Sequence, residues 1–327
     1  MAVCNFQESS KLTAKAYQHL CNAALSTSHL AITIWTFAAA DLRTMVLPLL
    51  LLGLLSASAG TVFTVSPIAL VDIVKNVPGM FVWLWLNVLL ISISNQRTPH
   101  AIIEDKINKP WRPIPSGRID VLHARQLLLW AVAVLLLVSH RLGVLYETLG
   151  CLAGNWIYND LEGGDEHFLL RQLLNGVAYL PYGIGSMKLA VGVIDGHNEP
   201  SAEFYRWITL IAAIVGTTIQ VQDLKDCDGD RARNRHTFPV VLGERITRIS
   251  VCVGVLFWSV LCPVYWNLAW HSCLLSGGLG VMVILSVSFL RGRQADKMSF
   301  VLWSFWLMSL FVLPSISQQS GWLVYSS

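Results

Sequence analysis

Long apolar runs alternate with short polar connections along most of this chain. A run of about 20 apolar residues can cross the hydrocarbon core of a bilayer as a helix. Turns or charged segments separate successive runs of roughly that length. The pattern predicts nine membrane-spanning helices, over about 43–62, 71–94, 121–139, 142–160, 169–190, 204–222, 247–266, 269–290 and 298–316.

The segment before the first run has a different character. The first 28 residues are mildly polar, and they lack the basic start, apolar core and small-residue cleavage site of a secretory signal. The apolar stretch 29–40 is too short to span a bilayer, so we expect it to lie at the interface. We therefore divide the chain into a cytosolic or interfacial segment, 1–42, and a transmembrane domain, 43–327.

Composition supports a membrane protein over a water-soluble helical one. Hydrophobic residues make up 54% of the chain and charged residues 13%, with a mean hydropathy of +0.55. Soluble domains carry roughly a quarter charged residues. The seven cysteines are scattered and show neither a metal-ligand spacing nor a disulfide framework. We predict an all-α, polytopic membrane protein.

The positions of Lys and Arg predict its orientation. The connections 95–120, 223–246 and 291–297 are basic, whereas 62–70, 191–203 and 267–268 contain no Lys or Arg. Basic connections favour the cytosolic side. We expect a multi-pass protein of an endomembrane such as the endoplasmic reticulum, with a cytosolic N-terminus. Arg141 and Lys75 run against the pattern, and the connection 160–168, on the cytosolic side, is acidic.

Two basic connections also contain carboxylates, and we call them the first mouth (95–118) and the second mouth (222–243). Three aspartates of the second mouth, Asp223, Asp226 and Asp230, share one face if a helix continues through them. Carboxylates and cations at a membrane edge are costly unless they bind something charged. The two mouths follow the second and sixth predicted spans, so both are expected on the cytosolic side.

The chemistry of the mouths favours a prenyl diphosphate as ligand. No glycine-rich loop precedes a helix, which disfavours a nucleotide. Mg²⁺ prefers oxygen ligands and usually combines one or two carboxylates with substrate phosphates, while Lys and Arg bind phosphate oxygens. The apolar bundle would hold the prenyl tail. We expect Mg²⁺ dependence, with Mn²⁺ as a substitute, and no zinc site.

Both mouths resemble the aspartate-rich signatures of a known family. DKINKPWRPIPSGR at 105–118, and DLKDCDGDR at 223–231 with PVVLG at 239–243, are similar to the two motifs of the UbiA superfamily of intramembrane prenyltransferases. The resemblance covers nearly the whole chain. It implies a helical bundle around a central cavity and Mg²⁺-dependent use of an isoprenyl diphosphate, without haem, flavin or nucleotide.

The resemblance also implies roles for individual residues. Asp105 matches the second Asp of the first motif, and Asp226 and Asp230 match the DxxxD of the second, so these three are the expected catalytic residues. The expected metal ligands are oxygen donors of the two mouths: Glu104, Asp105, Asp223, Asp226 and Asp230. The expected substrate-binding residues are Asn95, Lys109, Arg112, Lys225 and Arg231.

The first mouth departs from the usual NxxxDxxxD pattern. Ala101 stands where the first Asp is expected and Arg97 where the Asn is expected, while Asn95–Gln96 supply a polar pair and Glu104 precedes Asp105. This altered motif resembles a fungal branch of membrane-bound terpene cyclases of the bergamotene-cyclase type. The segments 158–161 and 171–175 also look like that branch.

Two enzymatic outcomes share one ionisation step. In the favoured reading, farnesyl diphosphate ionises and the cation cyclises on its own double bonds to a terpene. In the alternative, a UbiA-type prenyltransferase passes the prenyl group to an aromatic or other small acceptor. A non-catalytic lipid-binding or transport protein is disfavoured because the charges cluster at helix ends on one face. The expected partners are the isoprenyl diphosphate and the bilayer, with no nucleic acid and no obligate protein partner.

Overall fold

The structure is a computed structural model that describes residues 28–64, 67–192 and 199–317. These residues form helices and no strand, as the apolar runs predict. The main helices are α2 (Leu47–Ser58), α3 (Leu70–Gln96), α4 (Pro99–Asn108), α5 (Val121–Arg141), α6 (Leu145–Asn155), α7 (Gly163–Glu166), α8 (Phe168–Val191), α9 (Ala202–Thr218), α10 (Cys227–Arg233), α11 (Phe238–Leu242), α12 (Glu244–Tyr265), α13 (Leu274–Phe289) and α14 (Arg293–Leu310). Shorter 3-10 or π-helical segments are η1 (Leu42–Val46), η2 (Gly60–Val62), η3 (Trp156–Asp160), η4 (Ile219–Asp226) and η5 (Trp270–Cys273).

Each predicted span contains a helix, but fewer than nine are long and apolar enough to cross a membrane by themselves. Six candidates meet that description among the described residues, and a helix at Ser28–Ala39, bent by 48° from Leu42–Ser58, raises the number to seven if the pair is one span. The remaining two spans correspond to α6 and α8. Helix α6 is short, and α8 carries buried polar residues such as Arg171 and Gln172. Nine crossings therefore stay a prediction.

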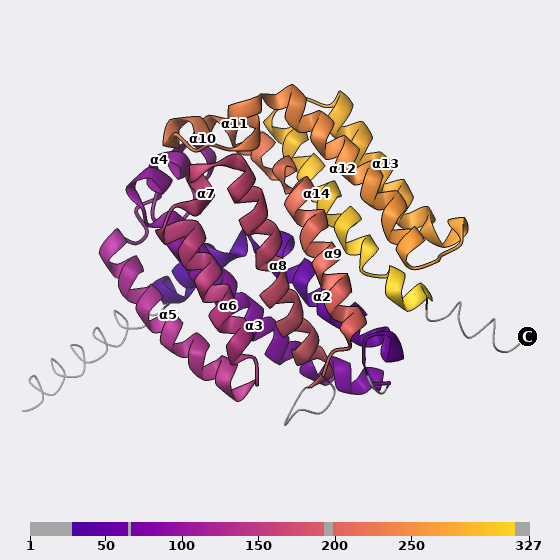
Figure 1. Cartoon of the computed structure of the whole chain (residues 1–327). Coiled ribbons are helices and arrows are strands. Elements are labelled where there is room, and N and C mark those ends of the chain that lie inside the picture. Colours follow the sequence, from indigo (N-terminus) through magenta and orange to yellow (C-terminus); the bar gives the residue numbers. More distant parts are fainter. Residues whose placement is uncertain (1–27, 65–66, 193–198, 318–327) are drawn as a thin grey trace, which may run out of the picture.

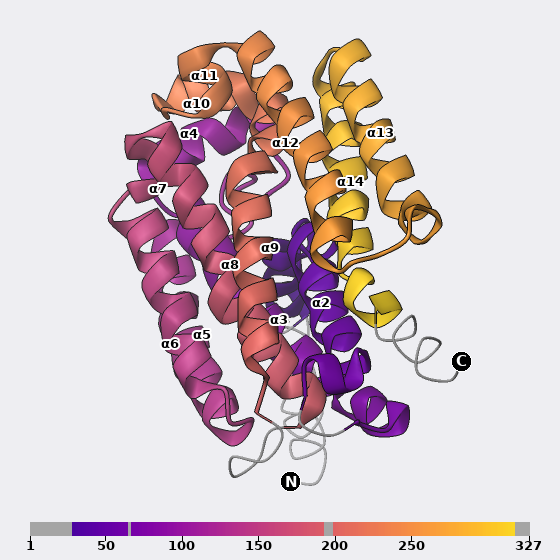
Figure 2. The same cartoon turned by 45° about the vertical axis from the view of Figure 1, so that its right-hand side comes forward.

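The long helices run side by side, and the short helices gather at one end of the bundle (Figures 1 and 2). Helix α8 lies at the centre of the packing, since it contacts α9, α2, α3 and α6. Helices α12, α13 and α14 pack together, with α14 against α2. The short helices α4, α7, α10 and α11 cover the end of the bundle where α3 and α9 finish (Figure 2). The residues predicted to bind substrate all belong to this end.

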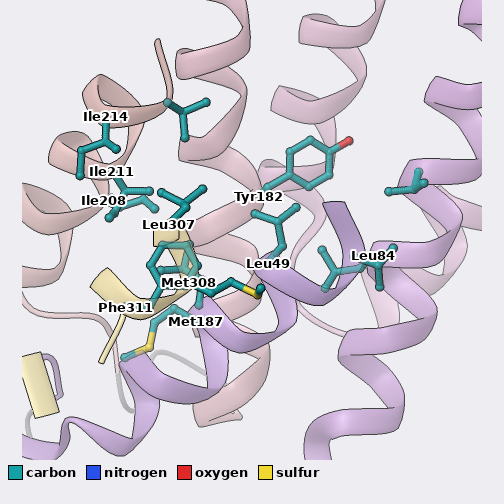
Figure 3. Packing of buried hydrophobic residues seen from close by; sticks show 14 of the residues in the cluster. Leu49, Leu84, Tyr182, Met187, Ile208, Ile211, Ile214, Leu307, Met308 and Phe311 are labelled. Atoms are coloured by element: carbon teal, nitrogen blue, oxygen red, sulfur yellow. The ribbon is translucent and has the colours of Figure 1, made fainter. Parts of the chain in front are cut away.

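Large apolar side chains from α2, α8, α9 and α14 interlock inside the bundle (Figure 3). Hydrogen bonds join the helices where indole groups enter this core. Trp83 donates to the Thr148 hydroxyl at 2.8 Å, and Trp303 donates to the Thr218 hydroxyl at 3.0 Å. Such bonds are useful in a bilayer, where lipid tails are as apolar as the core and burial alone gives little drive for helix association.

Close contact between α8 and α9 depends on a glycine. A methyl group at Gly176 would lie 2.5 Å from the Ala212 carbonyl oxygen and 3.0 Å from the Gly216 Cα. Both atoms belong to the backbone, so neither can rotate away. Small residues of this kind let membrane helices approach closely.

We therefore expect Gly176→Ala to separate α8 from α9. Overpacking of this kind costs about 1–3 kcal/mol, which would lower the thermal unfolding midpoint of the protein in detergent by several degrees. Gly277→Ala on α13 is the matched control, because no atom lies within 4 Å of its added methyl group. It should leave the midpoint unchanged or raise it slightly, since Ala favours a helix over Gly. Equal midpoints for both variants would contradict the packing argument.

Candidate active site

The two mouths, more than a hundred residues apart in the sequence, meet where α4 packs against α10. The Asn108 side chain donates to the Asp226 carbonyl oxygen at 3.0 Å. A methyl group at Gly229 would lie 2.1 Å from the Asn108 amide nitrogen, so this approach requires a residue without a side chain. The contact fixes the position of one mouth against the other.

The first mouth begins a new helix directly after α3. The Thr98 hydroxyl accepts from the Ala101 backbone N–H, and Pro99 occupies the first helical turn, where its missing N–H costs nothing. The helix carries Glu104 and Asp105, which are both buried. Adjacent positions on a helix point in different directions, so the two carboxylates find different partners.

Asp105 pairs with Arg112, so this ion pair lies within the first mouth. The Arg112 guanidinium donates to both carboxylate oxygens, at 2.9 and 3.0 Å. Burial raises the pKa of the Asp105 carboxyl despite this partner. For Glu104 the balance is reversed, because Arg235, Lys109 and Arg233 outweigh the effect of burial and hold its pKa below the ordinary value.

The second mouth does not continue as one regular helix. The 3-10 helix η4 ends at Asp226 and α10 begins at Cys227, so the condition for a shared α-helical face is not met. Asp223 binds the Arg171 guanidinium through both oxygens, at 2.8 and 3.3 Å. Asp226 lies 2.7 Å from the Lys225 ammonium and 3.6 Å from that of Lys109. Lys109 therefore links the first mouth to the second.

Asp230 differs from the other carboxylates because it lacks a hydrogen-bond partner. Its side chain is 1% exposed, and neither oxygen accepts a hydrogen bond. The nearest cation is Arg235, at 3.7 Å. Leaving an ionised carboxylate buried with unused acceptor capacity is costly. Asp230 is thus the mouth residue with the most to gain from a bound cation.

A cluster of four charges joins the mouths to a third segment. We call Glu104, Asp165, Arg233 and Arg235 the charge cluster. Arg233 donates to Asp165 at 2.8 Å and to Glu104 at 2.9 Å, while Arg235 donates to Asp165 at 2.6 Å. Asp165 belongs to α7, in the acidic connection 160–168, and so its carboxylate meets the basic end of the second mouth. The positive charge of this end explains why an acidic connection lies here.

Arg171 is a central residue of the site that sequence reasoning did not assign. Besides Asp223, its guanidinium lies over the Tyr158 ring, 5.6 Å from the centroid, and donates to the Tyr158 hydroxyl. Arg171 is 5% exposed and lies near the start of α8. The sequence does contain a signal for Arg171, because an arginine inside a predicted span is costly unless it has a specific partner.

Most of the predicted site residues come together, and two, Arg231 and Asn95, do not. Those joined through the contacts above or through shared charges are Glu104, Asp105, Lys109, Arg112, Asp223, Lys225, Asp226 and Asp230. Arg231 instead pairs with Asp228 on the exposed side of α10. Asn95 lies near the end of α3, and its side-chain oxygen is buried without a partner.

Buried amides without partners lie at the same end of the bundle. Gln96 on α3 and Gln172 on α8 are buried, and neither atom of either amide group makes a hydrogen bond. The same holds for the Asn159 side-chain oxygen on η3 and the Asn175 nitrogen on α8. Buried polar groups are normally satisfied. These amides therefore offer hydrogen-bond donors and acceptors to a polar ligand next to the mouths.

The carboxylate oxygens of the mouths suit a hard cation such as Mg²⁺, and most of these carboxylates are paired with a guanidinium or ammonium group. Within 28–64, 67–192 and 199–317, no three His, Cys, Asp or Glu side chains lie close enough together to hold a metal ion. Carboxylate oxygens are the preferred ligands of Mg²⁺, and the unpartnered oxygens of Asp230 fit that role. Asp223 and Asp226 would have to exchange a guanidinium or ammonium partner to join it.

Comparison with known proteins decides the family. The sequence model of the UbiA prenyltransferase family matches residues 46–311. The chain belongs to this family. Its members are prenyltransferases or terpene cyclases, so the protein is an enzyme of one of these two kinds.

Relatives and a solved structure agree with this assignment. The chain is 32% identical to a somaliensene A/B synthase of Streptomyces somaliensis over 68% of its own length and 74% of the relative. It is 25% identical to the fumagillin β-trans-bergamotene synthase of Aspergillus fumigatus, over 88% and 93%. The fold resembles a UbiA homologue from Archaeoglobus fulgidus bound to GPP and Mg²⁺, with a TM-score of 0.51, 14% identity, and coverage of 84% and 99%.

The different surroundings of Asp223 and Asp230 predict opposite effects on stability. Asp223→Asn leaves the buried Arg171 guanidinium without a carboxylate, which costs about 3–5 kcal/mol when a buried pair is broken. Asp230→Asn removes a buried charge that has no hydrogen-bond partner, so the thermal midpoint should stay the same or rise. Thermal unfolding of the purified variants in detergent measures both. A loss of stability in Asp230→Asn as large as that in Asp223→Asn would contradict this assignment.

Proposed function

We propose that this protein ionises an isoprenyl diphosphate, farnesyl diphosphate or a near relative, and cyclises the resulting cation to a terpene inside the helical bundle. The observation that carries the proposal is the meeting of the two mouths. Five carboxylates and several buried cations lie together at one end of a bundle whose interior is apolar. That arrangement suits a substrate with an anionic head and a long apolar tail.

The cations of the mouths would bind the diphosphate. Lys109 and Lys225 are paired with Asp226, and Arg112 with Asp105. Each could exchange its carboxylate partner for a phosphate oxygen, because both groups are anionic acceptors. Glu104, Asp105, Asp223, Asp226 and Asp230 are the proposed metal ligands, with Asp230 the readiest. When bound, Mg²⁺ would neutralise negative charge on the leaving diphosphate.

The relatives support the choice of substrate and metal. The UbiA homologue from Archaeoglobus fulgidus is described as bound to GPP and Mg²⁺, a prenyl diphosphate and the metal that we propose here. Mn²⁺ is expected to substitute because it accepts the same oxygen ligands.

Cyclisation is favoured over transfer to an acceptor for two reasons. The Streptomyces and Aspergillus relatives are both named as synthases, of somaliensene and of bergamotene. The first mouth also departs from the usual motif, with Ala101 in place of an aspartate. The second candidate is a prenyltransferase, as the family description indicates. In both cases the ionisation step is the same, and the products differ.

We also propose that the mouths face the cytosol in an endomembrane such as the endoplasmic reticulum. The basic connections 95–120, 223–246 and 291–297 support this orientation. Asp165 pairs with Arg233 and Arg235, so the acidic connection 160–168 lies at the same end of the bundle.

Substitutions in the second mouth test the roles of its carboxylates. Asp226→Asn and Asp230→Asn should each lower turnover by on the order of 10²-fold, the scale expected when one charge-stabilising group is lost. Asp228→Asn is the matched control, because Asp228 pairs with Arg231 on the exposed side of α10. Its turnover should stay close to that of the wild type. Equal and mild effects at all three positions would argue that these acids merely balance nearby cations.

The reaction itself can be tested with membranes that contain the protein, farnesyl diphosphate and Mg²⁺, followed by mass spectrometry of the extract. We expect a cyclic terpene without any added acceptor, and no product after exhaustive EDTA treatment. Product formation only after a phenol or quinone precursor is added would instead identify a prenyltransferase. Full activity in EDTA would overturn the metal-dependent mechanism for either outcome.

A further inference from the structure

A basic cavity lies outside the mouths, where the start of α12 meets the end of α13, and its lining begins at Glu244, directly after the second mouth. It has a volume of about 600 Å³ and is lined by Glu244, Arg245, Arg248, Ile249, Cys252, Val253, Ser288 and Arg291. Three arginines and one glutamate give this lining a net positive charge. The start of α12 lies at the end of the bundle that also carries α10 and α11 (Figure 2).

The deepest of its arginines holds the helices together. Arg248 is 4% exposed and donates to the carbonyl oxygens of Val287 and Leu290 at the end of α13. It also lies 2.7 Å from the Asp296 carboxylate of α14. Its Nε is buried and has no hydrogen-bond partner. Arg248 therefore supplies a buried guanidinium to the lining of the cavity and joins α12 to α13 and α14.

The two outer arginines lack an acidic partner. Arg291 donates to the carbonyl oxygens of Val287 and Leu290, and both Arg291 and Arg245 are exposed. Neither forms an ion pair with any residue in the described part of the chain, because Glu244 pairs with Arg248. Guanidinium groups are well suited to phosphate, which they bind through two parallel hydrogen bonds.

An apolar stripe continues from this basic cavity along α12. Ile249, Val253, Leu256 and Val260 follow one another at helical spacing on the outer face, each more than half exposed. Arg245 stands one turn before the stripe begins. On a helix that spans a membrane, this order places a cation at the headgroup level and an acyl-length apolar track beneath it.

We propose that this cavity binds the phosphate of an anionic phospholipid, with an acyl chain along the α12 stripe. A bound lipid would contact α12 and α13 together, at the point where Arg248 already joins them to α14. The proposal concerns a site outside the mouths and does not depend on the reaction that the mouths catalyse.

Native mass spectrometry of the full-length protein in mild detergent tests the proposal, with equal amounts of phosphatidylglycerol and phosphatidylcholine added. We expect one retained phosphatidylglycerol per chain, in clear preference over phosphatidylcholine. Arg245→Gln/Arg291→Gln should weaken retention by roughly 30-fold, the combined effect of two cations at an anionic lipid surface. Arg245→Lys/Arg291→Lys should keep most of it.

The control variant is Arg125→Gln/Lys297→Gln, which removes the same charge from two exposed positions outside the cavity lining. It should retain the lipid as the wild type does. Equal loss in the control, or equal retention of both lipids by the wild type, would overturn the proposal. Binding of inorganic phosphate without any retention of phosphatidylglycerol would also overturn it, since the site would then bind a free anion only. The wild-type results decide the question even if the glutamine variant does not fold.

Discussion

The buried ion pairs made by the two mouths are the interaction on which the rest of this site depends. They join α4 and α7 to α10, and α8 to η4, and these elements come from distant parts of the chain. Removing one partner from such a pair leaves a buried charge uncompensated, which destabilises strongly. The same residues therefore hold the end of the bundle together and supply the charges that a diphosphate and a metal need.

This double role shapes the proposed reaction. The carboxylates and cations of the mouths satisfy one another, and Asp230 alone among the five carboxylates has no hydrogen-bond partner. In the proposed reaction the diphosphate takes over cations such as Lys109 and Arg112, which frees carboxylates for the metal. Substrate and metal would then depend on each other for binding. The unpartnered amides of Gln96 and Gln172 add polar groups just below, where the substrate head would meet the apolar interior.

The helical fold could be predicted because apolar periodicity reports directly on membrane-spanning helices. Every predicted span contains a helix, whereas the number of crossings stays a prediction because α6 is short and polar residues interrupt the apolar sequence of α8. The mouths were visible because carboxylates and cations are rare in so apolar a chain. The ion pairs that the mouths form could not be predicted, because each partner comes from a distant part of the chain. Asp223 pairs with Arg171 of α8, and Glu104 pairs with Arg233 of α10. The break between η4 and α10 could not be predicted either. Regular helical spacing therefore does not describe how Asp223, Asp226 and Asp230 are arranged. The motif predicts Arg231 at the site, but in the structure its side chain contacts Asp228 on the exposed side of α10. The sequence does not show this, because the exposure of Arg231 depends on how α10 packs.

The most direct test of this account is the thermal midpoint of the purified protein with Mg²⁺ alone, with a slowly ionising farnesyl thiodiphosphate alone, and with both. A ligand that binds only the folded state raises the midpoint according to its affinity. Because the carboxylates are held by their own cations, we predict that Mg²⁺ alone gives almost no increase and that both together give far more than the sum of the two. A full increase with Mg²⁺ alone would show a metal site that is assembled before the diphosphate binds, and would contradict the account.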